Sequence, residues 1–368
     1  MKKLLLISLF VVAAGAARSQ EFLWKLGMTT QFDNREYKSD YNWSQTLFGV
    51  RATPELGLGW NDNSVMAGLT YINEFGAPSY EFPTQIVLYY NYNDHRHYNI
   101  SGGVIPRTQS IARYSRAFFS DSVMFYHPNI GGLLAQIYGQ KGYFEFACDW
   151  DSRQSITRRE MFTLFSAGEA HLGPVLGGYN FSMHHHAGTM VPDSLATARE
   201  NAVTDNIWVY PYVGVNLQRY LPVDSLFVSV GWLQSFQHDR SFDANYVTPG
   251  GVQIEALVQK WGFGIYNTLY LGPSLMPYFS AYGATLYWGD PFYATTKGVY
   301  DRLELYWQPI LRRDMSLKIS SVHHFDGTRW SWQQMVSFSL NLDKGMFDHK
   351  EKPVKHKKVE RERIFYLQ

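Results

Sequence analysis

The sequence predicts an all-β fold, a transmembrane antiparallel up-and-down β-barrel of about 16 strands. Three observations predict it. Apolar and polar residues alternate in segments of about ten residues, the length of a strand that crosses a membrane obliquely. No second long apolar stretch follows the start of the chain. Every second connection between the expected strands is short, as the turns on one side of such a barrel are.

The N-terminus has the parts of a secretory signal peptide. Lys2 and Lys3 form a basic start. Residues 4–12 are almost entirely apolar, and small residues at 14–17 offer a cleavage site. The alternative, a single anchoring helix, needs about 20 apolar residues. We therefore expect a signal peptide over residues 1–19, an outer-membrane β-barrel over residues 20–342 and a basic polar tail over residues 343–368.

Composition narrows the class further. Aromatic residues make up 17% of the 368-residue chain and charged residues only 18%, against about 25% charged in ordinary soluble domains. Tyr and Trp settle at the headgroup level of a membrane, so this balance favours a surface that faces lipid. The single cysteine, Cys148, excludes a disulfide framework within one chain. The net charge of +1 argues against a nucleic-acid partner.

The alternation is clearest in three segments. Residues 252–259 place Val, Ile, Ala and Val on one face, and Gln, Glu and Gln on the other. The same period of two runs through residues 144–151 and 336–342. One face of each strand therefore favours lipid and the other favours water. A soluble sandwich shows the same alternation, so the loop lengths have to decide between the two folds.

Short and long connections alternate along the chain. Residues 61–63 and 94–96 are short connections, whereas residues 107–129 form a long one. Short periplasmic turns and long outer loops are typical of a bacterial barrel. A further candidate strand at residues 276–289 is rejected because it makes the strand number odd and contains a proline and a glycine. The expected strands lie near residues 22–32, 45–59, 64–74, 83–93, 97–106, 130–139, 143–151, 158–170, 175–186, 206–217, 224–236, 250–260, 262–271, 298–308, 314–324 and 330–342.

Such a sheet has to close, because every backbone N–H and C=O group in hydrocarbon needs an internal partner. A barrel of about 8 strands is filled by its own side chains, whereas one of about 16 leaves an aqueous channel. We therefore expect a barrel in the outer membrane of a Gram-negative bacterium, surrounded by outer-membrane lipid. Its expected function is the passage or export of small hydrophilic solutes, as a monomer or a homo-oligomer.

The third outer loop, residues 107–129, is long and rich in aromatic residues, and we expect it to fold inward and narrow the channel. The alternative is an outward lid packed on neighbouring loops. Opposite charges on the loop and the wall would set up a transverse field across a constriction. The expected constriction residues are Arg107, Arg113, Arg116 and Asp121 on the loop, facing Glu145, Asp149 and Asp151 on an acidic wall.

Chemistry is suggested by two side-chain groups. The paired carboxylates Asp149 and Asp151 suit general acid and base catalysis, although no nucleophile is identified beside them. Residues two apart on a strand share a face, so a polar lumen site is expected from Asn180, Ser182, His184 and His186. His323 and His324 are candidate additions from another strand, but a complete metal site is not evident, and wet-end polar residues are the simpler interpretation. The motifs of serine hydrolases, phosphate loops and zinc proteases are absent from the sequence. No catalytic residue, metal or cofactor is therefore predicted.

Two further segments have open interpretations. Residues 286–293 are aromatic and suit either a glycan contact or the core of a loop. The tail is either a solvated extension or a segment whose apolar end, residues 364–367, binds a periplasmic partner or the barrel mouth.

The chain resembles Gram-negative outer-membrane barrels of the porin-like kind over about residues 22–342. The segments most similar to barrels of uncharacterised function are residues 117–121, 128–134, 149–154 and 286–293. The resemblance implies a barrel whose third outer loop lines a pore, and it implies no substrate. The basic tail departs from an ordinary porin.

Two alternatives to the channel remain. One is an outer-membrane enzyme that acts on lipid or glycan, with His184, His186 and Asp149 as candidate residues. The other is a structural or assembly barrel that recruits a periplasmic complex through its C-terminal tail.

Overall fold

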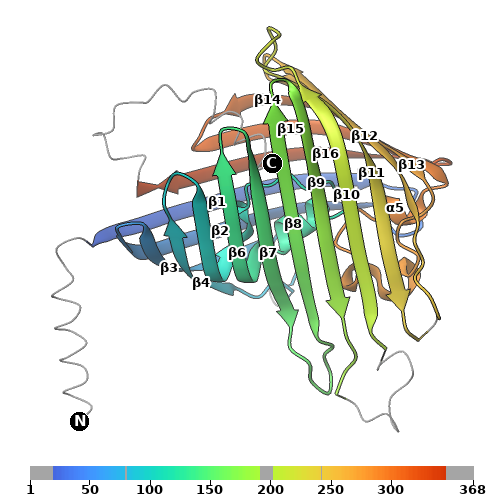
Figure 1. Cartoon of the computed structure of the whole chain (residues 1–368), viewed down its shortest axis with the longest axis horizontal. Coiled ribbons are helices and arrows are strands. Elements are labelled where there is room, and N and C mark those ends of the chain that lie inside the picture. The colour runs from blue at the N-terminus through green and yellow to red at the C-terminus, as the bar shows by residue number, and fades with distance from the viewer. Residues whose placement is uncertain (1–19, 79–80, 191–201, 242, 345–368) are drawn as a thin grey trace.

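A computed structural model describes residues 20–344, with gaps at residues 79–80, 191–201 and 242. The described chain forms 16 antiparallel strands that close into one barrel (Figure 1). The expected fold class is therefore confirmed. The expected signal peptide and nearly all of the expected tail lie outside the described residues. The strands are β1 (Glu21–Glu36), β2 (Gln45–Trp60), β3 (Asn63–Glu74), β4 (Gln85–Asn93), β5 (Tyr98–Pro106), β6 (Asn129–Gly139), β7 (Gly142–Ser152), β8 (Met161–Leu172), β9 (Val175–His186), β10 (Thr204–Asn216), β11 (Ser225–Asp239), β12 (Gly250–Lys260), β13 (Phe263–Gly272), β14 (Gly298–Leu311), β15 (Met315–Phe325) and β16 (Trp330–Asp343).

The first and last strands close the sheet. β1 pairs with β16 along its length, from Lys25 opposite Asp343 to Glu36 opposite Trp332. This pairing removes both sheet edges, so the strand backbones are hydrogen-bonded within the barrel. Within the described ranges, no helix is long and apolar enough to span a bilayer.

The period-two pattern sorts side chains between the lumen and the outside of the barrel. On β12, Gln253 and Glu255 are buried in the lumen, whereas Val258 is 39% exposed on the outer face. β7 follows the same rule, with Glu145 buried inside and Phe144 exposed outside. The outer face is therefore apolar over most of its height, as contact with lipid requires.

The expected strands are all present, and their ends shift by a few residues. β1 continues past residue 32 because Asn34 and Arg35 still pair with β16. The rejected strand at residues 276–289 contains the helix α4 (Phe279–Tyr282) and the 3-10 helix η2 (Gly283–Thr285). The prediction that this segment is not a strand is confirmed.

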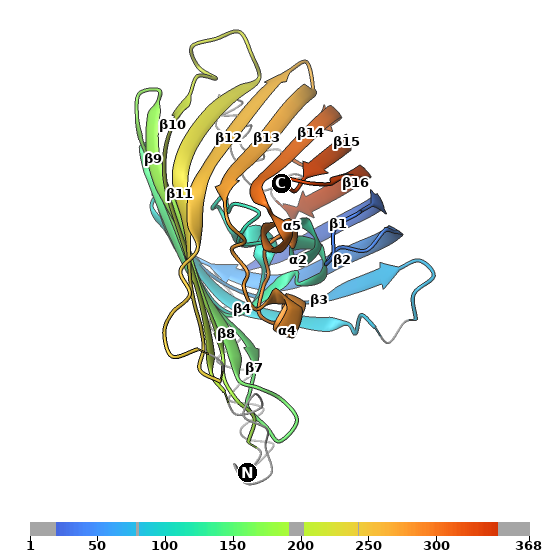
Figure 2. The ribbon, with the colours of Figure 1, turned by 90° about the vertical axis from the view of Figure 1, so that its right-hand side faces the viewer.

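Two outer loops fold into the lumen. The third, between β5 and β6, carries the 3-10 helix η1 (Arg107–Gln109) and helix α2 (Asp121–Tyr126), and the seventh, between β13 and β14, carries α4, η2 and α5 (Phe292–Thr295). Figure 2 shows α2, α4 and α5 inside the ring of strands. We call these two loops together the plug.

The two loops of the plug are joined to each other by their backbones. The amide of Ser120 donates to the carbonyl of Trp288, and the amide of Asp290 donates to the carbonyl of Arg116, both at 2.8 Å. A side chain at Gly289 would collide with the backbone of Ala117, so glycine allows this close approach. Aromatic and aliphatic residues of both loops then form one hydrophobic cluster with the barrel wall. The lumen is thus occupied by a packed structure.

Candidate functional site

The arginine that begins the third loop is held at the wall of the barrel. The Arg107 guanidinium contacts the Asp149 carboxylate at 2.6 Å, and both side chains are buried. Its remaining faces lie against the rings of Phe119, Phe165 and Trp288, each about 5.4–5.5 Å from the guanidinium carbon. The ion pair and the ring contacts fix the start of the loop against β7 and β8.

The other two loop arginines cross to the opposite wall. Arg113 pairs with Glu255 of β12. Arg116 contacts Asp121 of the same loop at 3.1 Å and Glu304 of β14 at 3.9 Å. Of the three arginines expected to face the acidic residues of β7, Arg107 contacts one of them, whereas Arg113 and Arg116 contact other carboxylates. A strand pattern does not reveal how far a loop reaches across the lumen.

Two acidic residues of β7, Glu145 and Asp149, anchor the loop. Glu145 accepts hydrogen bonds from the Ser110 hydroxyl at 2.6 Å and from the Ile111 amide at 2.7 Å. Asp151 accepts from the Thr163 hydroxyl at 3.3 Å. These carboxylates are thus occupied by bonds within the protein, and a transverse field across an open constriction stays a prediction.

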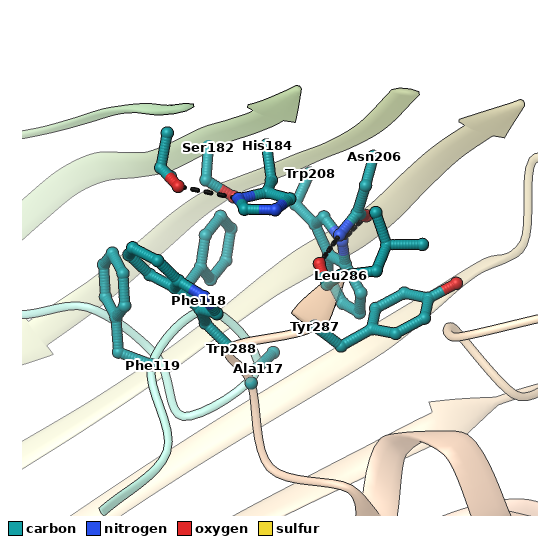
Figure 3. Close-up of a pocket in the computed structure, with 12 residues that line it drawn as sticks. Ala117, Phe118, Phe119, Ser182, His184, Asn206, Trp208, Leu286, Tyr287 and Trp288 are labelled. Atoms are coloured by element: carbon teal, nitrogen blue, oxygen red, sulfur yellow. Dashed lines mark hydrogen bonds between the residues drawn. The ribbon is translucent and has the colours of Figure 1, made fainter. Parts of the chain in front are cut away.

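The histidine-bearing face of β9 lines a small cavity between the plug and the wall (Figure 3). Asn180, Ser182, His184 and His186 all point into the lumen and are buried. His184 Nδ1 lies 2.8 Å from the Thr163 hydroxyl, and His184 Nε2 lies 3.1 Å from the carbonyl of Thr285. The cavity volume is about 20 Å³, enough for about one water molecule. This site has the polar groups of a reactive centre but no room for an organic substrate.

The lumen histidines stack with other rings. The ring centroids of His184 and His186 are 6.3 Å apart with 25° between the ring planes, and the His186 ring lies 5.4 Å from that of Tyr282. Across the described ranges, no group of three or more His, Cys, Asp or Glu side chains is placed to hold a metal ion.

His323 and His324 do not join this site. They are neighbours on β15, which pairs with β14 and β16 and not with β9. Adjacent side chains of a strand point to opposite faces, so the two histidines separate. His324 enters the lumen, where its Nδ1 lies 2.9 Å from the Tyr300 hydroxyl and its ring stacks on Phe292 at 4.2 Å. His323 lies on the lipid-facing side.

A second polar group lies on that lipid-facing side of β14, β15 and β16. The Ser321 hydroxyl is 3.1 Å from Nε2 of His323, within hydrogen-bonding distance. Ile319 lies on the same face and is 39% exposed, which shows that this face is on the outside of the barrel. A serine bonded to an imidazole is the geometry of a nucleophile and its general base.

Two neighbouring strands supply further polar groups to the same face. Asp301 of β14 lies diagonally across from His323, since Leu303 is the residue opposite this histidine. The Asn267 amide donates to the Asp301 carboxylate at 2.6 Å. Gln334 of β16 lies directly opposite Ser321. We call Ser321, His323, Asp301 and Gln334 the lipid-facing cluster.

The amide of Gln334 is oriented by a chain of hydrogen bonds. Its oxygen accepts from the Asn34 amide at 2.7 Å, and the Asn34 oxygen accepts from the Thr46 hydroxyl at 2.7 Å. The Gln334 oxygen is thus engaged, and its NH₂ group is oriented as a hydrogen-bond donor. This group can donate to an oxyanion that develops near Ser321.

Aromatic residues mark the depth of the cluster in the membrane. His323 lies opposite Trp332, and the exposed Trp330 lies opposite Phe325 at the outer end of β15. The rings of Phe325 and Trp330 contact each other at 4.8 Å. Because Trp gathers at membrane interfaces, this places His323 near the headgroup boundary of the outer leaflet.

Ser321, Asp301 and Gln334 were not among the site residues predicted from the sequence. The available signal was the spacing of Ser321 and His323, which puts a hydroxyl and an imidazole on one face. The adjacent His323 and His324 suggest a histidine pair, which obscures the spacing of Ser321 and His323.

Comparisons with known proteins identify the family. Residues 14–347 match the model of a family described as lipid A 3'-O-deacylase-type. No curated protein matches the sequence significantly. A solved structure with a similar fold is the loop L8 deletion mutant of OmpT, an outer membrane protein of Vibrio cholerae. Its TM-score is 0.53 at 7% identity, over 88% of this chain and 100% of that chain.

A second similar structure is OprB of Pseudomonas putida, with a TM-score of 0.47 at 9% identity, over 90% of this chain and 96% of that chain. The closed 16-strand barrel and its likeness to the OmpT barrel agree with the porin-like fold that the sequence predicted. Because the family model spans most of the sequence, the chain belongs to the lipid A 3'-O-deacylase-type family.

Proposed function

We propose that this protein is an outer-membrane esterase that removes an acyl chain from a lipid A-type glycolipid of the outer leaflet. The observation that carries the proposal is the hydrogen-bonded pair of Ser321 and His323 on the lipid-facing wall. The family description, which names lipid A 3'-O-deacylation, supports the same chemistry. This is the enzyme alternative of the sequence analysis, carried by different residues.

The proposed chemistry rests on the Ser321–His323 hydrogen bond and on the register positions of Asp301 and Gln334 beside that pair. The Ser321 oxygen attacks the ester carbonyl while Nε2 of His323 takes the hydroxyl proton. The NH₂ group of Gln334 donates to the oxyanion, and His323 then returns the proton to the departing sugar oxygen. A water molecule activated by His323 hydrolyses the acyl-enzyme and releases the fatty acid. Asp301, diagonally across from His323 on the same face, is the nearby carboxylate that favours the charged form of the imidazole through its negative charge, without a direct hydrogen bond to it.

Access favours the lipid-facing cluster over the lumen site. A cavity of about 20 Å³ beside His184 has no room for an acyl chain. A glycolipid in the outer leaflet, by contrast, reaches the outer wall sideways without leaving the membrane. Its ester groups lie near the boundary between headgroup and hydrocarbon, the level that Trp332 marks for His323.

Two adjacent serines provide the test. Ser321→Ala should lower the release of fatty acid from lipid A in mixed micelles by roughly 10⁴-fold or more, because the nucleophile is lost. Ser320→Ala is the matched control, since Ser320 is buried on the lumen face. Mass spectrometry of the lipid product measures both variants, and heat-modifiable gel mobility shows that each barrel is folded.

The same assay separates the two candidate sites. If the Ser321→Ala barrel is folded and releases fatty acid at the wild-type rate, the proposal is wrong. Alanine at His184, His186 and Asp149 is expected to leave release intact in any barrel that still folds. Loss of fatty-acid release in the folded triple variant would indicate that the reaction takes place in the lumen.

A narrow channel is a second candidate function, favoured by the strand number. A wall of 16 strands encloses an aqueous lumen in other barrels, and here loops fill that space. Deleting residues 111–126 should raise single-channel conductance in a planar bilayer, because this segment crosses the lumen. Unchanged conductance would argue against a pore narrowed by this loop. Ser321→Ala is the control that leaves the lumen untouched.

A further inference from the structure

Another ionisable row lies on the outer wall, on β9, β10 and β11. His185 pairs in register with Asp205, and Asp205 pairs in register with His238. Their neighbours His184 and Gln237 point into the lumen and are buried, so the row itself faces outward. Ionisable side chains on the lipid-facing wall of a barrel lower its stability when they lie away from the membrane interfaces. A row of three such side chains therefore requires an explanation.

Asp205 is the centre of the row and is neutralised within it. His185 Nδ1 lies 3.6 Å from one carboxylate oxygen of Asp205. Arg240 contacts the other oxygen at 3.1 Å, and the Tyr246 hydroxyl donates to that oxygen at 3.3 Å. The Arg240 side chain nevertheless stays 55% exposed, so much of its guanidinium faces outward.

The two imidazoles each present a second ring nitrogen. Nε2 of His238 lies 3.0 Å from the carbonyl of Asp243, and a carbonyl only accepts, so this nitrogen carries the proton. The His238 ring also packs on Tyr246 at 4.9 Å. Nδ1 of His238 and Nε2 of His185 are the remaining nitrogens, and both donate when the rings are charged. With Arg240 they make three cationic or proton-donating groups around one carboxylate.

The surroundings place the row at the headgroup level. The Phe162 ring lies 4.9 Å from that of His185, and Trp150 stacks on Phe162 at 5.1 Å. Two residues further into the membrane on the same outward faces, Met183 and Ile207 are apolar. The row is thus bordered by an aromatic girdle and lies above hydrocarbon-facing residues.

We propose that His185, His238 and Arg240 form a binding site for the phosphoryl headgroup of an outer-leaflet lipid. Arginine binds phosphate oxygens through its planar fork of N–H donors, and the imidazoles supply two more donors in their protonated form. A cation is a poorer occupant, because within the described residues no cluster of acidic and His side chains is placed to bind a metal ion. The outward face, the girdle and the apolar strip below select a lipid over soluble phosphate.

This site is separate from the lipid-facing cluster. It lies on β9 to β11, whereas Asp301, Ser321 and Gln334 lie on β14 to β16. A lipid held here keeps its headgroup in place whether or not the chain hydrolyses esters. Binding is therefore measured without reference to the proposed reaction.

The test measures lipid binding by native mass spectrometry of the full-length protein in detergent. The probes are phosphorylated lipid A, the same lipid dephosphorylated, and inorganic phosphate. The double variant Arg240→Gln with His238→Ala should bind phosphorylated lipid A at least tenfold more weakly than the wild type. Arg329→Ala is the matched control, because Arg329 is another exposed rim arginine paired with one aspartate, Asp40, at 2.7 Å.

Each outcome bears on the proposal. Weaker binding in the double variant with unchanged binding in Arg329→Ala supports it. Equal binding of phosphorylated and dephosphorylated lipid overturns it, and so does displacement of the lipid by inorganic phosphate at equal concentration. If the double variant fails to fold, Arg240→Lys replaces it. That variant keeps the charge but loses the fork, and unchanged lipid binding there also overturns the proposal.

Discussion

The polar residues on the two faces of β14 and β15 have different neighbours. On the lumen face, Glu304 is 3.0 Å from Arg302 and 2.7 Å from Lys318, and Arg302 also reaches Asp121 of the plug at 3.3 Å. On the lipid face, Ser321 and His323 contact each other and no charged group of the plug. The comparison teaches that lumen polar groups are explained by holding the plug. Polar groups facing lipid need another explanation, because lipid gives them no partner.

Strand alternation makes this comparison testable, since neighbouring residues of one type fall on opposite faces. Ser320 and Ser321 form one such pair, and His323 and His324 form another. Substituting one member of a pair changes one face and leaves the other as it was.

The largest expected effect separates His323 from His324. His323→Ala should lower kcat for acyl release by roughly 10³-fold, because the general base is lost, and should leave unfolding unchanged. His324→Ala removes the partner of Tyr300 and the ring against Phe292, so it should lower the free energy of unfolding by about 1–3 kcal/mol. Acyl release and urea unfolding in phospholipid vesicles measure the two effects. An equal loss of kcat in both variants would show that the lipid-facing histidine has no special role in acyl release.

An intermediate effect is expected in the lumen at Arg107. Arg107→Ala leaves the buried Asp149 carboxylate without its ion-pair partner, which should lower the free energy of unfolding by about 3–5 kcal/mol. Arg312→Ala is the control, because Arg312 pairs with Asp314 at 3.1 Å in an exposed turn, where such a pair contributes about 0–1 kcal/mol. Urea unfolding followed by tryptophan fluorescence compares them. Similar losses in both variants would show that the plug is not held by its buried ion pair.

The strands were predictable because each follows a local rule. Segments such as residues 252–259 show the period of two directly, and short turns fix where neighbouring strands meet. The plug was only half predictable. The third loop was expected inside because of its length and aromatic content, but the seventh enters through distant contacts, such as Tyr282 with Asp239 of β11 at 2.5 Å. No local pattern encodes such a contact.

The candidate site was harder to predict, for a physical reason. The alternation of faces is visible in the sequence, so His184 and His186 were assigned to the lumen face, where their buried side chains lie. The placing of Asp301 diagonally across from His323, and of Gln334 opposite Ser321, depends on the register of β14 and β16 against β15. A shift of one residue would turn the whole set to the other face, and sequence alone does not fix that register.

The smallest expected effect is at Asp94, which lies on neither face of the wall. Its carboxylate accepts hydrogen bonds from the backbone amides of Tyr98, His97 and Arg96 in the turn before β5, and these bonds lower its pKa from 3.8 to about 2. Because its pKa is lowered in the folded protein, the Asp94 carboxylate stabilises the folded state at pH values above its ordinary pKa of 3.8. This contribution disappears as the pH falls through about 2. Asp94→Asn should therefore slightly lower the unfolding midpoint at pH 7, and the difference from the wild type should shrink between about pH 4 and pH 2. Asp62→Asn in the preceding turn controls for the lost charge. A difference that stays constant with pH would mean that the amide packs poorly in the turn and that the charge contributes nothing.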